Sequence, residues 1–264
     1  MNFSYIILFR TMIRILIGLL FASALEISTH NGYAQPARGY DDAIAVKARP
    51  FGDSLVLRWA PLSFEAWRDG NHFGYRIERY LISQKGKIRS SPEKTVLIDT
   101  IRPAPSALWK TLGTTDKYAA IAAQALFGDH FNIDLSKSST FDIVNKASEN
   151  EQRFSIALFS ADLSPKVAAL SGLRYCDTNT IRGEKYLYRV IINHPNELKG
   201  SLFLGPDDEY RLYPPPNLKG EFSERIATLY WNASANQTYS AYRIERSPNG
   251  LQFNPVSEDP FVTL

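Results

Sequence analysis

The sequence predicts a mainly β protein built from small β-sandwiches, and the chief reason is an internal repeat. Ser54–Trp59 alternates apolar and polar residues up to a Trp, and Tyr75–Arg79 (YRIER) follows it. The same order returns at Ile226–Trp231 and Tyr242–Arg246, which again reads YRIER. A period of two is typical of a strand with one buried face. Two such strands joined by a polar loop are typical of one half of a small β-sandwich. The repeat therefore predicts two related modules.

The composition is that of an ordinary globular protein. With 264 residues, 44% of them apolar and 22% charged, the chain is long enough for one or two domains with real cores. Its 14 Tyr and 15 Phe against 2 Met favour strands over helix bundles. The net charge of +3 is small and its signs are mixed along the chain, so no nucleic-acid partner is expected.

Residues 1–34 are interpreted as a signal peptide. Arg10 and Arg14 form a positive flank, the apolar run Ile15–Leu25 follows, and small residues end the segment at a cleavage site. The protein is therefore expected to be secreted or held at the cell surface, with no stable membrane span once the peptide is removed. The alternative is an uncleaved anchor, because Tyr5–Phe9 adds hydrophobic length.

The chain has one cysteine, Cys176. An exported protein with a single cysteine has no internal disulfide, so its modules must be stabilised by burial. Because strand-like residues flank it, Cys176 is expected to be a buried apolar filler and not a nucleophile.

Period-two runs and turn residues predict the strands of the first module. They are expected at 43–48, 54–59, 74–83, 95–98, 174–177, 186–192 and 201–204. The largely polar stretch Ala60–Phe73 is expected to be a loop, with Asp69 and Gly70 as its turn. On the strand Tyr75–Arg79, Arg76 and Glu78 are expected to face outward and to make ion pairs on a wet sheet face.

Helical patterns replace the alternation between Pro103 and Gly172. An Ala-rich stretch runs from Asp116 to Phe127, and further helix starts are indicated by the caps at Ser148 and Ser164. We therefore expect an α-helical insertion at about 106–172 within the first sandwich.

Three short motifs in the first module point to one family. They are Leu-x-Trp at Leu57 and Trp59, Tyr-x-Ile-x-Arg at Tyr75, Ile77 and Arg79, and Gly-x-x-Tyr-x-Tyr-Arg-Val at Gly183, Tyr186, Tyr188, Arg189 and Val190. In these residues the chain resembles the B, C and F strands of a fibronectin type III domain, which implies an immunoglobulin-like sandwich. The resemblance implies that Trp59 lies between the two sheets and that Tyr186 makes the tyrosine corner.

The motifs divide the chain into modules. A fibronectin type III-like domain is expected at 43–212, a Pro-rich linker at 213–217, and the N-terminal part of a second such domain at 218–264. The second module has no counterpart of the Tyr-x-Tyr-Arg-Val strand, so it is expected to be incomplete and to belong to a larger multi-domain protein. The expected core residues are Trp59, Tyr75, Ile77, Tyr186, Tyr188, Val190, Trp231, Tyr242 and Ile244.

No motif in the sequence indicates catalysis. The four His residues, at 30, 72, 130 and 194, have no second His or Cys at ligand spacing, and the common nucleophile, phosphate-binding and dinucleotide-binding motifs are missing. We therefore expect no catalytic residue, no metal site and no cofactor.

The expected function is that of a non-catalytic extracellular interaction or spacer module of a bacterial exported protein, with a protein or carbohydrate partner. A candidate interaction surface lies on the insertion at Trp109, Tyr118, Phe127 and Phe131, although these rings could instead pack the helices onto the sheet. One alternative is that the modules are accessory domains of a secreted carbohydrate-active or proteolytic enzyme whose catalytic part lies beyond Leu264. Another is a carbohydrate- or peptide-binding module that acts through the insertion.

Overall fold

The computed structural model describes residues 43–131, 149–210, 214–232, 241–258 and 260–262. The proposed signal peptide and the first residue of the linker, Tyr213, lie outside this range. The chain divides into two compact units. We refer to the described residues 43–131 and 149–210 as the larger unit and to those between 214 and 262 as the C-terminal unit.

One sheet of the larger unit has three antiparallel strands in the order β1-β2-β5. They are β1 (Ile44–Phe51), β2 (Ser54–Pro61) and β5 (Arg174–Asp177). A tight turn joins β1 to β2, and Gly52 adopts a φ of 62°, which a residue without a Cβ adopts at little cost.

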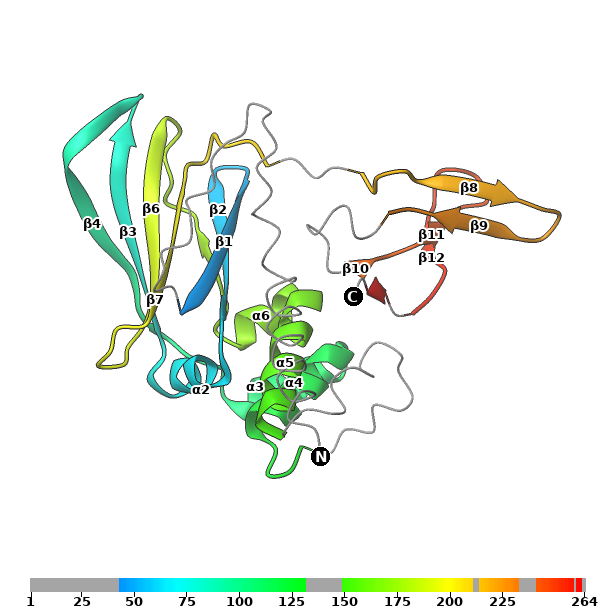
Figure 1. Cartoon of the computed structure of the whole chain (residues 1–264), viewed down its shortest axis with the longest axis horizontal. Coiled ribbons are helices and arrows are strands. Elements are labelled where there is room, and N and C mark those ends of the chain that lie inside the picture. The colour runs from blue at the N-terminus through cyan, green and yellow to red at the C-terminus, as the bar shows by residue number, and fades with distance from the viewer. Residues whose placement is uncertain (1–42, 132–148, 211–213, 233–240, 259, 263–264) are drawn as a thin grey trace, which may run out of the picture. The chain divides into compact units, whose positions relative to one another are not determined.

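The other sheet has four antiparallel strands in the order β4-β3-β6-β7. They are β3 (Tyr75–Gln84), β4 (Lys87–Ile101), β6 (Glu184–Ile192) and β7 (Lys199–Leu204). Figure 1 shows the two sheets of the larger unit as separate layers. The chain is thus mainly β with several antiparallel sheets, an arrangement consistent with a β-sandwich.

Alternate side chains of β2, β3 and β6 form the core of the larger unit. The expected core residues Trp59, Tyr75, Ile77, Tyr186, Tyr188 and Val190 are all buried there. The rings of Trp59 and Tyr75 meet edge to face, with 5.7 Å between their centroids. Tyr75 lies opposite Ile192 in the ladder and Ile77 opposite Val190, so the inward positions of neighbouring strands share one face.

The stretch predicted to be a loop contains helix α2 (Phe64–Phe73), so that prediction was wrong. The Ser63 hydroxyl caps the helix by accepting a hydrogen bond from the Ala66 N–H. Gly70 is not a turn residue but lies inside the helix, where an added Cβ would be 2.0 Å from the Tyr75 hydroxyl oxygen. The polar residues that suggested a loop are the solvent-facing side of this amphipathic helix.

Strand β4 is much longer than the short strand predicted at 95–98. Most of its side chains are exposed and polar, so its sequence lacks the alternation by which a half-buried strand is recognised. Its backbone pairs with β3 from Lys87 to Ile101, with register shifts along the way. Tertiary pairing, and not side-chain burial, therefore defines this edge strand.

Four helices lie between β4 and β5 in the sequence. They are α3 (Ser106–Gly113), α4 (Lys117–Phe127), α5 (Glu149–Leu163) and α6 (Pro165–Leu170). The Asp116 carboxylate caps α4, and the Ser164 hydroxyl caps α6. The Ser164 hydroxyl also donates a hydrogen bond to the Asp116 carboxylate at 2.6 Å. The two helix starts are thereby fixed to each other.

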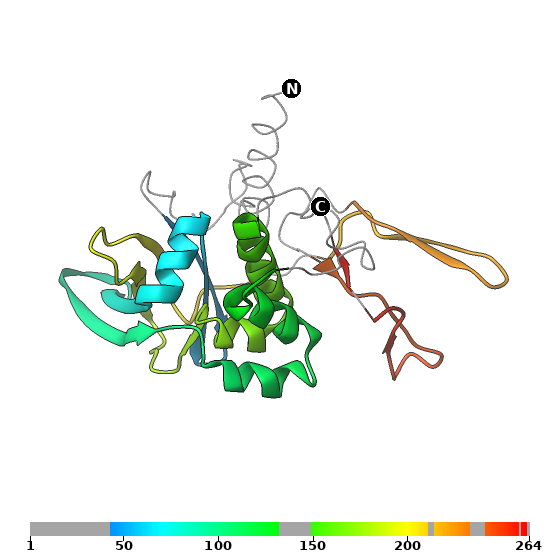
Figure 2. The same cartoon turned by 90° about the horizontal axis from the view of Figure 1, so that it is seen from below.

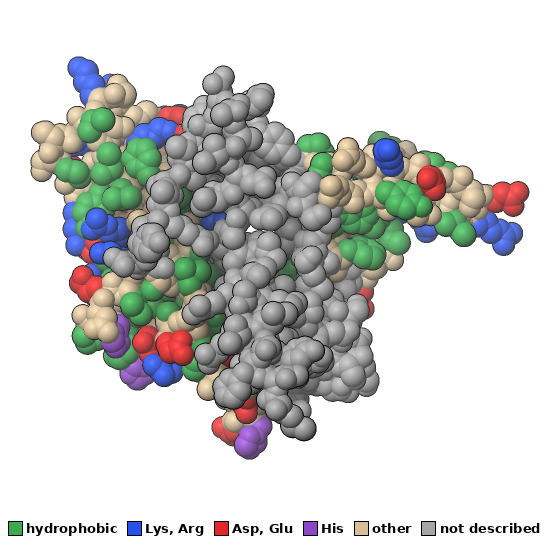
Figure 3. Space-filling model, in the orientation of Figure 1, with side chains coloured by type: hydrophobic (Ala, Val, Ile, Leu, Met, Phe, Trp, Pro, Cys, Tyr) green, Lys and Arg blue, Asp and Glu red, His purple; other side chains and the backbone are tan. Residues whose placement is uncertain are grey.

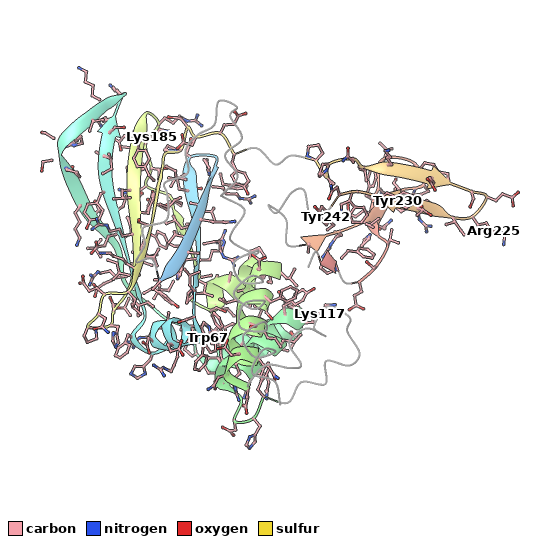
Figure 4. All side chains as sticks on the ribbon, viewed as in Figure 1. Trp67, Lys117, Lys185, Arg225, Tyr230 and Tyr242 are labelled. Carbon is pink, nitrogen blue, oxygen red and sulfur yellow. The ribbon has the colours of Figure 1, made fainter. Side chains whose placement is uncertain are left out.

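Small residues allow the helices to pack closely. Ala119, Ala122 and Ala125 form the buried side of α4, which lies beside α5 in both views of the molecule (Figure 2). Trp67 of α2 packs against Phe154 of α5 at 6.1 Å between ring centroids (Figure 4). Helix α2 thus bridges the sheets and the helices of the larger unit.

Cys176 was expected to be buried, but it is half-buried. It lies in β5 opposite Val56, and this pair is on the sheet face that points away from the core. The inward positions of β5 are Tyr175 and Asp177, which pair with Leu57 and Leu55. The expectation failed because a short strand does not reveal which of its faces is buried.

The C-terminal unit consists of short strands. They are β8 (Lys219–Phe222), β9 (Ala227–Tyr230), β10 (Ala241–Tyr242), β11 (Glu245–Arg246), β12 (Asn254–Pro255) and β13 (Phe261–Val262). Among the described residues they pair two by two, as β8-β9, β10-β13 and β11-β12.

Truncation of the central indole tests the core of the larger unit. We expect Trp59→Ala to lower the free energy of unfolding by about 3–5 kcal/mol, because it leaves a large cavity between the sheets. Urea unfolding measures this change. Phe51→Ala, which truncates an exposed ring on the adjoining strand, should cost less than about 0.5 kcal/mol. A loss below about 1 kcal/mol for Trp59→Ala would show that the indole is not central to the core.

Candidate functional site

The aromatic residues proposed on the helical segment do not form an exposed cluster. Trp109 is 1% exposed, and its indole N–H donates to the Ala104 carbonyl at 3.0 Å. Phe131 is also buried, Tyr118 is half-buried, and only Phe127 has a largely exposed ring, which packs on Trp109. Burial therefore favours the packing alternative for Trp109, whose ring contacts Phe127, and for Phe131, whose ring centroid lies 5.4 Å from the Arg153 guanidinium.

The outward residues of β3 form a tightly paired group. Glu78 is 2% exposed, although it was expected on a wet sheet face. Its carboxylate accepts hydrogen bonds from Arg76 at 3.1 Å and from the Tyr80 hydroxyl at 2.7 Å, and it pairs with Lys94 at 2.5 Å. Desolvation raises the pKa of Glu78, but the hydrogen bonds from Lys94 and Tyr80 and the positive charges outweigh it, so the pKa is lowered.

A second polar network lies on the inner side of the sheets. Asp177 of β5 is 1% exposed and accepts from Arg79 at 2.8 Å and from the Tyr188 hydroxyl at 2.7 Å. Arg79 also donates to the Asn179 carbonyl at 2.6 Å. Burial raises the pKa of Tyr188, and the neighbouring Asp177 charge raises it further. The network joins β5 of one sheet to β3 and β6 of the other.

A pocket of about 270 Å³ adjoins this network and is lined in part by Arg79, Glu184 and Tyr186. The Tyr186 hydroxyl donates to Glu184 at 2.5 Å and accepts from the Ile181 N–H at 2.9 Å, while the guanidinium of Arg79 lies 4.8 Å from the Tyr186 ring centroid. Desolvation and the Glu184 carboxylate raise the pKa of Tyr186 to about 12, so this phenol stays protonated at neutral pH. In the wall of this pocket, Tyr186 and Glu184 are thus hydrogen-bonded to each other, and Arg79 is paired with Asp177.

A larger hollow of about 460 Å³ lies where β6 leaves the sheet, and it is lined by residues that include Arg76, Asn193 and His194. The His194 ring is held by two contacts. Its Nδ1 accepts a hydrogen bond from the Asn196 N–H, and its ring centroid lies 5.0 Å from that of Phe73. Within the part of the chain that the structure describes, no group of three or more His, Cys, Asp or Glu side chains is placed to hold a metal ion.

The same described residues contain no helix with the length and apolar character needed to cross a membrane. Exposed large apolar side chains are concentrated on the surface of the C-terminal unit. They include Leu218, Phe222, Ile226, Leu229, Tyr230, Leu251, Phe253, Val256 and Phe261. Figure 3 shows hydrophobic side chains at the surface over β8 and β9.

The internal repeat supplies a reference for this surface. In the larger unit Leu57, Trp59, Tyr75 and Ile77 are fully buried, whereas their counterparts Leu229, Trp231, Tyr242 and Ile244 are partly exposed. Leu229 is 39% exposed. The aromatic pair of the motif is nevertheless retained, since the rings of Trp231 and Tyr242 are 5.3 Å apart, close to the 5.7 Å between Trp59 and Tyr75.

Strand register places these residues together. In the β8-β9 ladder Leu229 lies opposite Gly220 and Ala227 opposite Phe222, so the Phe222 and Leu229 side chains share one face, and Trp231 continues it. The Phe222 ring is 79% exposed and folds over Gly220. We call this surface the open face and define it by Phe222, Leu229, Trp231, Tyr242 and Ile244. The other face of the hairpin carries Tyr230, labelled in Figure 4, whose hydroxyl donates to Glu221.

Sequence reasoning missed Phe222 as a surface residue. It was not assigned to a strand, because the run Lys219–Phe222 contains Gly and two charged residues and has little alternation. Leu229 and Trp231 occur at alternate positions. This alternation could have predicted a neighbouring strand that pairs with them.

Comparison of the chain with models of protein families, with curated proteins and with solved structures finds no match.

Removal of the buried carboxylate tests the inner network. We expect Asp177→Ala to lower the free energy of unfolding by about 3–5 kcal/mol, because the charge of Arg79 is left without its partner in a largely desolvated place. Asp53→Ala removes a carboxylate that pairs with Arg182 in solvent, so it should cost less than about 1 kcal/mol. Equal losses of unfolding free energy for the two variants, measured in urea, would contradict the role of Asp177 as the partner that neutralises Arg79.

The lowered pKa of Glu78 predicts a pH dependence of stability. Its stabilising contribution is complete above its unfolded-state pKa of about 4.5 and is lost as the pH falls through the lower folded-state value. Between about pH 5 and pH 2, unfolding free energy should therefore fall less steeply in Glu78→Gln than in the native protein. Glu93→Gln, an exposed change on the adjoining strand, is the control and should retain the native slope.

Proposed function

We propose that the chain is a non-catalytic interaction protein, exported from the cell, whose modules are of fibronectin type III type and whose C-terminal unit binds a protein partner. Support for export comes from the positive flank and apolar run in residues 1–34. Support for a structural role of the charged groups at the two hollows comes from three pairs, Arg79 with Asp177, Tyr186 with Glu184, and Arg76 with Glu197.

Strand order supports the family resemblance. The first, second and fifth strands form one sheet, and the third, sixth and seventh are neighbours in the other, with the fourth added at the edge. Immunoglobulin-like sandwiches distribute their strands in this way. The hydrogen bond from the Ile181 N–H to the Tyr186 hydroxyl joins the tyrosine to the backbone just upstream, as a tyrosine corner does. The helices α3–α6, which lie between β4 and β5 in the sequence, support the proposed insertion.

The observation that carries the proposal is the difference in burial between the two copies of the repeat. Leu57 and Trp59 are fully buried, while Leu229 is 39% exposed and Trp231 is partly exposed. Leaving apolar side chains such as these in water forgoes roughly 25 cal/mol for each Å² that could be buried. Exposed apolar patches of this kind are typical of protein-binding sites, and a simple spacer would not need one.

The open face favours a protein partner over a carbohydrate. Its residues are Phe, Leu, Trp, Tyr and Ile, and the aliphatic members offer no hydrogen bonds to sugar hydroxyls. A bound protein segment would instead bury apolar side chains against Phe222 and Leu229, as the cores of protein interfaces do.

Site-specific photo-crosslinking tests the proposal. A benzophenone amino acid placed at position 222 should give one discrete adduct with a component of the exported or surface fraction of the source cells. The same probe at position 88, an equally exposed apolar site on β4, should not give that adduct. The protein identified by mass spectrometry should then bind the purified chain, and about tenfold more weakly to Leu229→Asp. No discrete adduct, or the same adducts at both positions, would contradict a binding role for the open face.

A further inference from the structure

We infer that the pocket beside Tyr186 binds a free α-amino acid with an apolar side chain. The ammonium group of the ligand pairs with Glu184, and its carboxylate is bound by Arg79 and Arg89. This site belongs to the larger unit alone and does not depend on the proposed interaction of the C-terminal unit. Three features of the pocket support it: a buried carboxylate without a cation, an unused edge of a guanidinium, and an apolar wall between them.

The pocket lies on the inner face of the four-stranded sheet, near the start of β6, where Figure 4 labels Lys185. The described residues that line it come from β3, β4, β6 and the segment just before β6. Its volume is about 270 Å³, which is just below the range of roughly 300–1,000 Å³ for sites that bind drug-sized ligands. The pocket therefore suits a smaller molecule.

A β-bulge shapes the polar end of the pocket. In the ladder between β3 and β6, Leu81 lies opposite Tyr186 and Gln84 opposite Glu184, with a register shift between Leu81 and Ser83. Strict alternation would turn Gln84 to the outer face, but the extra residue of the bulge returns it to the inner face. Its side-chain Nε2 donates to the Glu184 carboxylate at 2.6 Å. Both side chains therefore line the pocket from the same face of the sheet.

Glu184 is a buried carboxylate whose charge has no cationic partner in the described part of the chain. It is 5% exposed, and its two oxygens accept hydrogen bonds from neutral donors, Gln84 and the Tyr186 hydroxyl. The adjoining Lys185 points to the other face of the sheet and pairs with Asp208. Because a buried charge without a counter-charge is costly, such carboxylates are normally paired with a cation. An ammonium group in the pocket would supply that charge.

Arg79 offers the opposite charge. Both hydrogen bonds that it donates among the described residues use Nη1, one to Asp177 at 2.8 Å and one to the Asn179 carbonyl at 2.6 Å. The edge formed by Nε and Nη2 is left for another acceptor, and it matches the two oxygens of a carboxylate. The guanidinium lies 4.8 Å from the Tyr186 ring centroid, and the hydroxyl of the same ring contacts Glu184 at 2.5 Å. The two charges are thus separated by a single tyrosine side chain.

The balance of charges favours a ligand that carries both signs. Arg89 and Glu93 of β4 also line the pocket and lie 3.8 Å apart, so the wall has two positive and two negative charges with Arg79 and Glu184. Asp177, which pairs with Arg79, adds a further negative charge and disfavours a simple anion. The two arginines disfavour a simple cation. A zwitterion satisfies both sets of charges at once.

Between the charged groups the wall is apolar. It consists of the half-buried Leu81, the ring of Tyr186 and Ile181, which is 59% exposed. An aliphatic or aromatic side chain placed against this wall would remove apolar surface from water, which stabilises the complex in proportion to the area covered. In a peptide the carboxylate would lie farther from the ammonium group, so a free amino acid fits the two charged ends better.

Calorimetric titration of the full chain with L-leucine tests the inference. We expect saturable binding with a Kd below about 1 mM. Two analogues each lack one charge: leucine amide has no carboxylate, and N-acetyl-leucine has no ammonium group. Each should bind about tenfold more weakly or worse, because one buried charge of the pocket then stays unpaired. Glycine should also bind more weakly than leucine, because it has no side chain to cover the apolar wall.

Two protein variants remove the same charge from opposite faces of the sheet. Glu184→Gln keeps the size of the side chain but not its charge, so its affinity for leucine should fall about tenfold or more. Glu78→Gln is the matched control, because Glu78 is 2% exposed but lies on the outward face of β3. It should bind leucine as the native chain does. Urea unfolding at the pH of the titration will show whether each variant is folded, and the analogue series on the native chain needs neither variant.

The outcomes are decisive for this pocket. Equal affinities for leucine, leucine amide and N-acetyl-leucine overturn the zwitterion site, and so does unchanged leucine affinity in folded Glu184→Gln. A failure of leucine, isoleucine and phenylalanine alike to bind also overturns it. Tighter binding of the dipeptide leucyl-leucine than of leucine overturns the free amino acid as the ligand. Crosslinking at position 222 concerns the C-terminal unit, so its result and these results can fail separately.

Discussion

The indole ring of Trp59 lies between the two sheets of the larger unit, where its edge-to-face contact with Tyr75 joins β2 to β3. The arrangement of the other elements follows from this contact. Tyr75 extends past the indole to Gly70, so α2 must present a residue without a side chain there. Among the described residues, the indole nitrogen of Trp59 and the Tyr75 hydroxyl have no hydrogen-bond partner, so their rings are held by packing contacts.

Charged side chains lie at the margin of this core. Arg79 continues the inward face of β3, where an unpaired cation would be costly, and Asp177 from the opposite sheet neutralises it. On the outward face of β3, the charge of Glu78 is likewise paired, because its carboxylate interacts with Arg76, Tyr80 and Lys94. Because these groups are paired with one another, the two polar clusters link neighbouring strands and, through Asp177, the two sheets of the larger unit.

The C-terminal unit contains the same motif, but the side chains of the motif are less buried there. Trp231 and Tyr242 pack together as Trp59 and Tyr75 do, yet Leu229 and Phe222 remain exposed beside them. One sequence motif therefore occurs in a closed and in an open form within the same chain. This difference in burial is the basis of the proposed interaction.

The sequence by itself determined the elements whose side-chain pattern has a local cause. Alternation placed the core residues of β2, β3 and β6, while the Ala-rich stretch Asp116–Phe127 and the cap residue Ser164 predicted helices. Tertiary structure alone decided that Ala60–Phe73 contains a helix, that β4 is long, and that Glu78 and Trp109 are buried. The physical reason is that burial, edge pairing and ion pairing depend on neighbours far away in the chain, which a local pattern does not contain.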